Sequence, residues 1–173
     1  MSEEWLERWL VGRIGWHEDG GNAALKRHWS ASDRRVLVPM CGKTVDMLWL
    51  EGQGNEVVGV ELSEIAVQGF FEENELAYTK QPGELAEYRA RDRRISLYCG
   101  DYFAFAGGQF DAHFDRGALI AMNPPVPGIP LVQLAHVGHH GGVAPAGGQR
   151  VDADVEQTVD VFLEKRRRVH RRV

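Results

Sequence analysis

The chain has 173 residues, of which 43% are hydrophobic and 26% are charged, and its formal net charge is −5. This length suits one domain with a buried core better than two. No apolar run approaches the ~18 residues that cross a bilayer, so the composition indicates a soluble globular protein and excludes a membrane protein.

The chain is predicted to begin with a helix. Trp5 and Trp9 are four residues apart with leucines beside them, which gives one aromatic and apolar helical face. This helix should end near Gly12, and a second short helix is expected over 23–29. The first ten residues carry acidic charge where a secretory signal peptide carries basic charge, which predicts a cytoplasmic protein.

Four strands are predicted next, and they alternate with helices at first. The strands are expected over 36–40, 56–62, 95–99 and 110–115. A helix over 45–51 separates the first two, and a helix capped by Ser63 separates the second from the third. The β-α-β-α-β order predicts a mainly parallel sheet and therefore a doubly wound α/β fold.

The composition changes after residue 125, so 1–125 is predicted to be the folded core and 126–173 an atypical, poorly ordered segment. The second part is rich in Gly, Pro and His, and only a short helix over 152–168 is expected in it. The last nine residues hold six of the twenty basic side chains. Such a tail could bind nucleic acid or another anion, but it has no interleaved aromatic residues, and a solvated tail is the simpler interpretation.

The turn after the first strand points to a ligand. It contains a single glycine, Gly42, whereas a loop that wraps a pyrophosphate needs several. Glu61 lies 19 positions beyond Gly42, close to the offset at which a carboxylate accepts hydrogen bonds from ribose hydroxyls; the alternative is an exposed carboxylate at a strand end. Asp101 follows the third strand and would contact adenine or cap a helix. Together they favour an adenosine ligand without a pyrophosphate, such as S-adenosylmethionine.

The cationic sulfonium of that ligand would be attracted to aromatic faces by about 0.5–2 kcal/mol. Trp5, Trp9 and Trp16 could supply those faces, although core packing of the first helix explains them equally well. The cluster of His136, His139 and His140 has no cysteine or carboxylate near it, so no metal site is predicted.

The two cysteines are predicted to be free thiols, as expected in a reducing compartment. Cys41 and Cys99 both lie at the ends of apolar runs. No histidine is placed beside Cys41 by the sequence, so a small buried hydrophobe is favoured over a nucleophile there.

Five segments carry a family resemblance: "WLERWLVGRIGWH", "VLVPMCGKTVDMLWL", "VVGVELSEIAVQGFF", "ISLYCGDYF" and "FDRGALIAMNP". In this order, from Trp5 to Pro124, they resemble the thiopurine S-methyltransferase family of S-adenosylmethionine-dependent methyltransferases. The P-[LM]-C-G-K turn and the DRGAL run are specific to that family. The resemblance implies a Rossmann-like class I methyltransferase sheet.

The resemblance also implies roles for single residues. Trp9 and the backbone of Met40 would contact S-adenosylmethionine, and Glu61 would hold its ribose. Asp101 and Tyr102 would border the adenine. The predicted cofactor-binding residues are Trp5, Trp9, Met40, Gly42, Glu61, Asp101, Tyr102 and Arg116, and the predicted acceptor residues are Trp16, in place of the usual phenylalanine, and Arg116.

The implied reaction is an in-line attack of a thiol, thione or selenide on the sulfonium methyl group, with no strong general base. The first helix is expected to act as a lid, and the protein is expected to be a monomer without nucleic-acid or membrane partners. The family's last strands, which help shape the acceptor pocket, are not recognisable here. A non-catalytic remnant that at most binds S-adenosylmethionine therefore stays open as an alternative.

Overall fold

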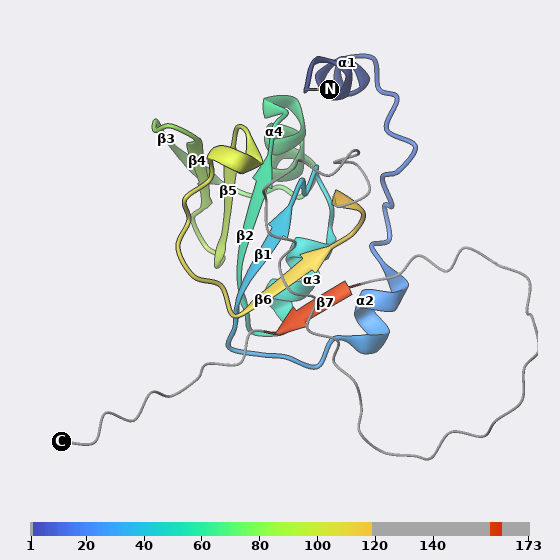
Figure 1. Ribbon diagram of the computed structural model, residues 1–173, viewed down its shortest axis with the longest axis vertical. Coiled ribbons are helices and arrows are strands. Elements are labelled where there is room, and N and C mark those ends of the chain that lie inside the picture. Colours follow the sequence, from blue (N-terminus) through green and yellow to red (C-terminus); the bar gives the residue numbers. More distant parts are fainter. Residues whose placement is uncertain (1, 119–159, 164–173) are drawn as a thin grey trace, which may run out of the picture.

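The computed structural model describes residues 2–118 and 160–163, which form a seven-stranded sheet with helices packed against it (Figure 1). The strand order is β3-β4-β5-β2-β1-β6-β7. In chain order the elements are α1 (Ser2–Leu10), α2 (Ala23–His28), β1 (Arg35–Pro39), α3 (Asp46–Gly52), β2 (Glu56–Glu61), α4 (Glu64–Glu73), β3 (Tyr78–Gln81), β4 (Ala86–Ala90), β5 (Ile95–Cys99), the 3-10 turn η1 (Tyr102–Ala104), β6 (Ala112–Asp115) and β7 (Asp160–Leu163).

The centre of the sheet is parallel. β5, β2, β1 and β6 pair in parallel, while β3, β4 and β7 join the two edges in antiparallel pairs. Parallel neighbours need crossover connections: α3 connects β1 to β2, and α4 followed by the hairpin of β3 and β4 connects β2 to β5. The predicted doubly wound, mainly parallel α/β fold is confirmed, and all four predicted strands exist.

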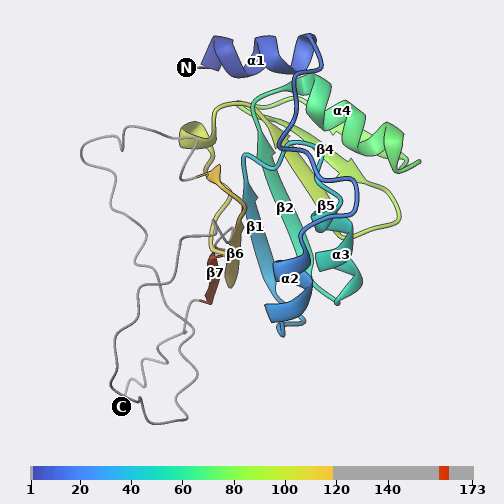
Figure 2. The same cartoon turned by 90° about the vertical axis from the view of Figure 1, so that its right-hand side faces the viewer.

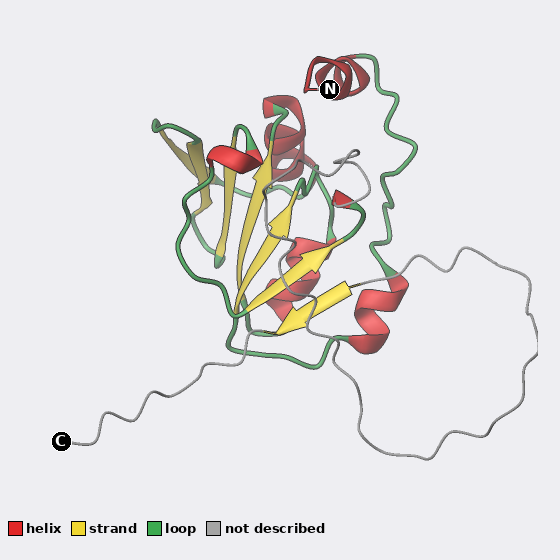
Figure 3. Cartoon of the chain, in the orientation of Figure 1, coloured by secondary structure: helices red, strands yellow, loops and turns green. Residues whose placement is uncertain are grey.

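The alternation of side chains along the strands builds a core on each face of the sheet. Val36 and Val38 of β1 belong to a cluster that includes Phe70 of α4, whereas Leu37 belongs to a second cluster with Val58 of β2. Helices α2, α3 and α4 lie together on the first of these faces (Figures 2 and 3). Val36 and Val38, the two neighbours of Leu37, are apolar because they pack against the buried faces of these helices.

Local capping fixes where the helices begin. The Ser63 side chain accepts the backbone N–H of Ala66 at 3.4 Å, as the spacing predicted, and Asn22 accepts that of Leu25 at 2.9 Å. Helix α1 lies above the carboxyl ends of β1 and β2 and contacts α4 (Figures 1 and 2). This position puts α1 next to the ligand end of the sheet.

Two elements differ from the sequence prediction. The hairpin of β3 and β4 was not predicted, because its strand residues are mostly polar and only Tyr88 and Ala90 are buried. The helix expected over 152–168 is wrong at Asp160–Leu163, which forms β7 and pairs antiparallel with β6. The run Val161–Phe162 suits a strand, and the edge of β6 offers unpaired backbone groups.

The remainder of the atypical segment lies outside the described residues. The histidine cluster at 136–140 and the basic tail at 165–173 belong to it, so the structure does not bear on either. Within 2–118 and 160–163, no helix is long and apolar enough to cross a membrane.

Candidate functional site

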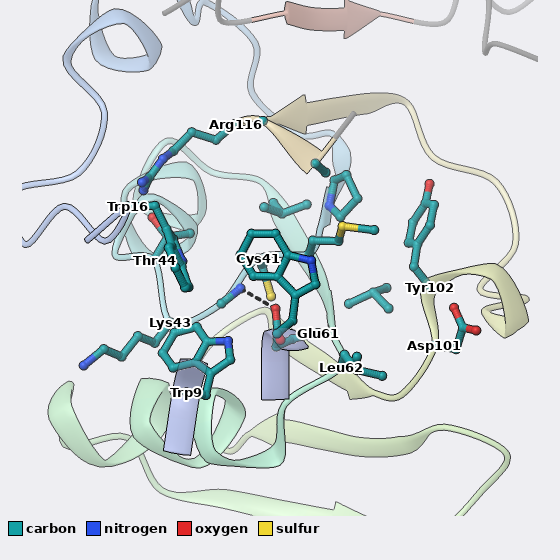
Figure 4. Close-up of a pocket in the computed structure, with 18 of the residues that line it drawn as sticks. Trp9, Trp16, Cys41, Lys43, Thr44, Glu61, Leu62, Asp101, Tyr102 and Arg116 are labelled. Carbon is teal, nitrogen blue, oxygen red and sulfur yellow. Dashed lines mark hydrogen bonds between the residues drawn. The ribbon is translucent and has the colours of Figure 1, made fainter. Parts of the chain in front are cut away.

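A pocket of about 450 Å³ opens where the carboxyl ends of the parallel strands meet (Figure 4). Its walls come from the ends of β1, β2 and β5, from the residues after β6, and from α1 with the loop that follows it. The volume is typical of small-molecule sites. Every predicted site residue lines this pocket: Trp5, Trp9, Trp16, Met40, Gly42, Glu61, Asp101, Tyr102 and Arg116.

Glu61 forms the floor of the pocket at the end of β2. Its Oε2 accepts the backbone N–H of Gly42 at 2.8 Å, and its Oε1 accepts that of Ser63 at 2.9 Å. The side chain is buried, so the alternative of an exposed carboxylate at a strand end is wrong. Burial raises the pKa of this carboxyl above its ordinary value, and the two backbone donors partly offset the rise. Each oxygen keeps a lone pair for a further donor.

The turn between β1 and α3 has a special backbone. Met40 and Gly42 have φ values of 45° and 55°, in the left-handed region that a residue other than glycine enters only at some cost. A Cβ atom on Gly42 would lie 3.1 Å from Cζ2 of Trp9. Glycine is thus needed both for the bend and for the close approach of α1.

The tryptophans of the N-terminal segment pack against one another at the pocket. The ring of Trp16 meets Trp5 edge-on at 5.1 Å and Trp9 at 6.1 Å between centroids. The Arg8 guanidinium already lies over the Trp5 ring at 4.7 Å. The three tryptophans therefore pack against one another and also line the pocket.

The wall opposite Trp16 and Arg116 is formed by Asp101 and Tyr102 (Figure 4). Oδ1 of Asp101 accepts the backbone N–H of Phe103 at 3.0 Å, so this side chain caps η1. It is exposed, and its Oδ2 accepts no hydrogen bond from the described part of the chain. Burial and then the Asp115 carboxylate raise the pKa of Tyr102 above its ordinary value.

Behind the turn lies a polar network that the sequence did not indicate. Asp46 is fully buried; its Oδ1 accepts the backbone N–H of Asn22 at 2.7 Å and its Oδ2 accepts the Thr44 hydroxyl at 2.9 Å. Thr44 lines the pocket. The network therefore ties the segment before α2 to the turn. The position of Asp46 in the first turn of α3 was the available signal.

The two cysteines are free, as predicted. Cys41 is buried, and burial followed by the nearby Glu61 carboxylate raises the pKa of its thiol well above the ordinary value. A thiol of this kind is a poor nucleophile. The interpretation of Cys41 as a small buried hydrophobe is confirmed.

Sequence reasoning missed two basic residues of the pocket wall. Lys43 reaches α4, where its Nζ lies 2.5 Å from Oε1 of Glu73, and His17 lies 3.3 Å from Asp19 through its Nε2. No sequence spacing linked either residue to a partner. Among 2–118 and 160–163, no group of three metal-ligating side chains occurs.

The sheet order and the position of the pocket define the Rossmann-like fold of class I methyltransferases, in which ligands bind at the carboxyl ends of the strands. Comparison with known proteins agrees. The model of the thiopurine S-methyltransferase (TPMT) family matches residues 1–127, and the chain belongs to that family.

The individual relatives are also thiopurine S-methyltransferases. The chain is 40% identical to the protein of Canis lupus familiaris over 136 residues, which cover 70% of the chain and 55% of that protein. It is 40% identical to the protein of Stutzerimonas stutzeri (strain A1501) over 144 residues, covering 79% and 60%, respectively. The protein of Mus musculus is 40% identical over 134 residues, covering 70% and 56%. The match thus spans little more than half the length of these relatives.

Proposed function

We propose that this chain binds S-adenosylmethionine and methylates the sulfur of an aromatic or heterocyclic thiol, a thiopurine or a related soft sulfur or selenium acceptor. The family uses S-adenosylmethionine, and its named members in the comparison are thiopurine S-methyltransferases. The single observation that carries the proposal is the buried Glu61 carboxylate, held by Gly42 and Ser63 on the floor of the pocket.

The residues present fit this cofactor. The free lone pairs of Glu61 would accept the ribose hydroxyls, and Oδ2 of Asp101 would accept the adenine amine, with Tyr102 beside it. One glycine, Gly42, is enough in the turn, because this ligand has no pyrophosphate. The apolar side chain of Met40 would line the wall next to the methionine part.

When bound, S-adenosylmethionine supplies an electrophilic methyl group on a cationic sulfur. The chain's own residues then align and enclose the reactants. The faces of Trp9 and Trp16 attract a cation, and the apolar wall excludes water. The guanidinium of Arg116 makes no ion pair with a described carboxylate, so it is available to stabilise thiolate character in the acceptor.

We further propose that α1 is the lid of this site. Helix α1 carries Trp5 and Trp9 onto the pocket, yet it meets the described remainder of the fold through few elements, chiefly α4 and the turn at Gly42. A helix held so lightly can open to admit ligands and close to exclude water.

The test is calorimetric titration of the full chain with S-adenosylmethionine, together with a methylation assay on a thiopurine and on a simple aromatic thiol. Binding with turnover supports the proposal. Binding without turnover indicates the alternative, a non-catalytic remnant, and the absence of binding would refute both.

A further inference from the structure

The loop after α1 places one imidazole in the wall of the pocket. His17 lines the pocket, and only 12% of its side chain is exposed. Its Nε2 lies 3.3 Å from Oδ1 of Asp19, whose side chain is fully exposed. Its neighbour Trp16 lies on the same side as Arg116 (Figure 4). The imidazole thus lines the same pocket as Trp16 and Arg116, the two residues assigned to the acceptor.

This placement is built into the fold. The backbone N–H of His17 donates to Ile14 at 2.8 Å, and that of Gly21 donates to Glu18 at 3.1 Å. The following residue, Asn22, is bound to the buried Asp46 at 2.7 Å. The loop is thus fixed on both sides of His17, in addition to the ring contacts of Trp16 with the first helix.

The Nδ1 atom of His17 is the ring nitrogen that could accept a proton from a ligand in the pocket. We assign the proton of the neutral ring to Nε2, the nitrogen that lies 3.3 Å from Oδ1 of Asp19, which leaves the lone pair on Nδ1. No hydrogen-bond partner of Nδ1 occurs among residues 2–118 and 160–163.

The other titratable groups of the pocket are engaged elsewhere or carry the wrong charge. The free lone pairs of Glu61 are assigned to the ribose hydroxyls, and Asp101 lies on the wall opposite Trp16 and Arg116 (Figure 4). Lys43 is paired with Glu73, and an arginine side chain has no lone pair to offer. Burial keeps the Cys41 thiol protonated by raising its pKa. Burial likewise raises the pKa of the Tyr102 hydroxyl and keeps it protonated, so His17 is what remains as an acceptor of the proton.

We propose that His17, oriented by Asp19, is a catalytic residue that removes the proton of the acceptor thiol and so extends the reaction to thiols that are not ionised at neutral pH. This inference rests on the proposed function. The thiol S–H bond breaks with its proton passing to the imidazole nitrogen. The sulfur forms a bond to the methyl carbon as the bond from that carbon to the sulfonium sulfur breaks. The positive charge ends on the imidazolium, which releases its proton to solvent.

The kinetic test compares two acceptors in the full chain and in His17→Gln. One acceptor is an aromatic thiol that is ionised at pH 7, and the other is a benzylic thiol that is protonated at that pH. His17→Gln should lower kcat/KM for the protonated thiol by about a hundredfold but for the ionised thiol by less than about threefold. His28→Gln, which alters an exposed histidine of α2, is the control and should change neither rate.

A binding test gives a second readout that needs no turnover. In the presence of S-adenosylhomocysteine, the near-ultraviolet absorbance of a bound aromatic thiolate is titrated with pH. The apparent pKa of the bound thiol should be lower in the parent chain than in His17→Gln by about one unit or more. Asp19→Asn should give a smaller shift in the same direction.

Each adverse result has a distinct meaning. An equal loss with both thiols, or no loss with either, would overturn the role of His17, and so would an unchanged bound-thiol pKa. Methylation of the ionised thiol alone by the parent chain would overturn this inference and leave the proposed function standing. Methylation of neither thiol would refute the proposed function, and the inference would fall with it.

Discussion

The carboxylate of Glu61 at the end of β2 accepts the backbone N–H of Gly42 in the turn that follows β1, at 2.8 Å. This hydrogen bond joins two positions that are 19 residues apart in the sequence. The second oxygen accepts the N–H of Ser63, the residue that caps α4. One buried side chain therefore sets the geometry of the turn after β1 and of the start of α4, and it also faces the pocket.

Replacement of this carboxylate by an amide should weaken both the fold and cofactor binding. In Glu61→Gln an NH₂ group would face one of the two backbone N–H donors, at a cost of about 1–3 kcal/mol in the free energy of unfolding. Loss of a charged acceptor for the ribose should weaken S-adenosylmethionine binding by about 10–100-fold. Urea unfolding and calorimetry measure the two effects. Glu56→Gln, on the exposed start of β2, should cost less than about 1 kcal/mol.

The same carboxyl should give stability a characteristic dependence on pH. Burial raises the pKa of Glu61 in the folded chain above its ordinary value of 4.5, so the folded state binds this proton more tightly than the unfolded state. Its contribution is fully present below pH 4.5 and is lost as the pH rises through the folded pKa. The free energy of unfolding of the parent chain minus that of Glu61→Gln should accordingly fall as the pH rises from 4.5. A difference that rises over this range would contradict the assignment.

Gly59, in the centre of β2, should tolerate no side chain. A Cβ atom there would lie 2.7 Å from Sγ of Cys41 and 2.9 Å from Sδ of Met47. Gly59→Ala should therefore lower the free energy of unfolding by about 1–3 kcal/mol, measured by urea unfolding. Adding Cys41→Ala should recover part of the loss, which a double-mutant cycle would detect. Gly52→Ala, with open space around its Cβ, serves as the control and should be close to neutral.

The buried network behind the turn should be costly to remove. Asp46→Ala leaves the backbone N–H of Asn22 and the hydroxyl of Thr44 without their acceptor, which should cost about 2–5 kcal/mol of unfolding free energy. Asp46→Asn keeps one acceptor oxygen and should cost less than the alanine variant. Glu72→Ala, on the exposed face of α4, should stay within about 0.5 kcal/mol of the parent chain. Equal stability of all three variants would show that the network contributes nothing.

The lid proposal predicts a change in hydrogen exchange. Amide exchange over 5–16 should slow when S-adenosylmethionine binds, because closure of α1 protects its backbone. Trp9→Ala removes the ring that meets Gly42 and should reduce both the protection and the affinity. Exchange in the central strand β2 should stay unchanged and is the internal reference. Protection over 5–16 that does not respond to the ligand would count against a lid.

Most of the parallel sheet was predictable because its strands are short apolar runs separated by capped helices. The prediction failed at the antiparallel edges. In β4 only Tyr88 and Ala90 are buried, and the Tyr88 hydroxyl donates to Glu64 of α4 while Lys80 of β3 pairs with the same carboxylate at 2.8 Å. A hairpin held by such contacts leaves little hydrophobic pattern in the sequence. β7 was missed because its pairing with β6 depends on a free strand edge and not on local periodicity.

Only some residues of the candidate site could be predicted from the sequence. The offset between Gly42 and Glu61, and the position of Asp101 after β5, could be derived from the sequence because a parallel sheet brings the carboxyl ends of its strands together. The positions of His17 and Asp46 could not. Their partners are set by how the N-terminal segment crosses the pocket and by which polar groups become buried there.

The sequence by itself determined the class of fold, the tight turn after β1 and the family. Strand periodicity, helix capping and the glycine of the turn are local features, so they can be recognised without knowledge of distant contacts. Only the tertiary structure decided that Trp9 packs on Gly42, that Glu61 is buried between two backbone donors, and that His17 faces the same pocket as Arg116. Those relationships arise when segments far apart in the chain bury their surfaces together, and no spacing in the sequence records them.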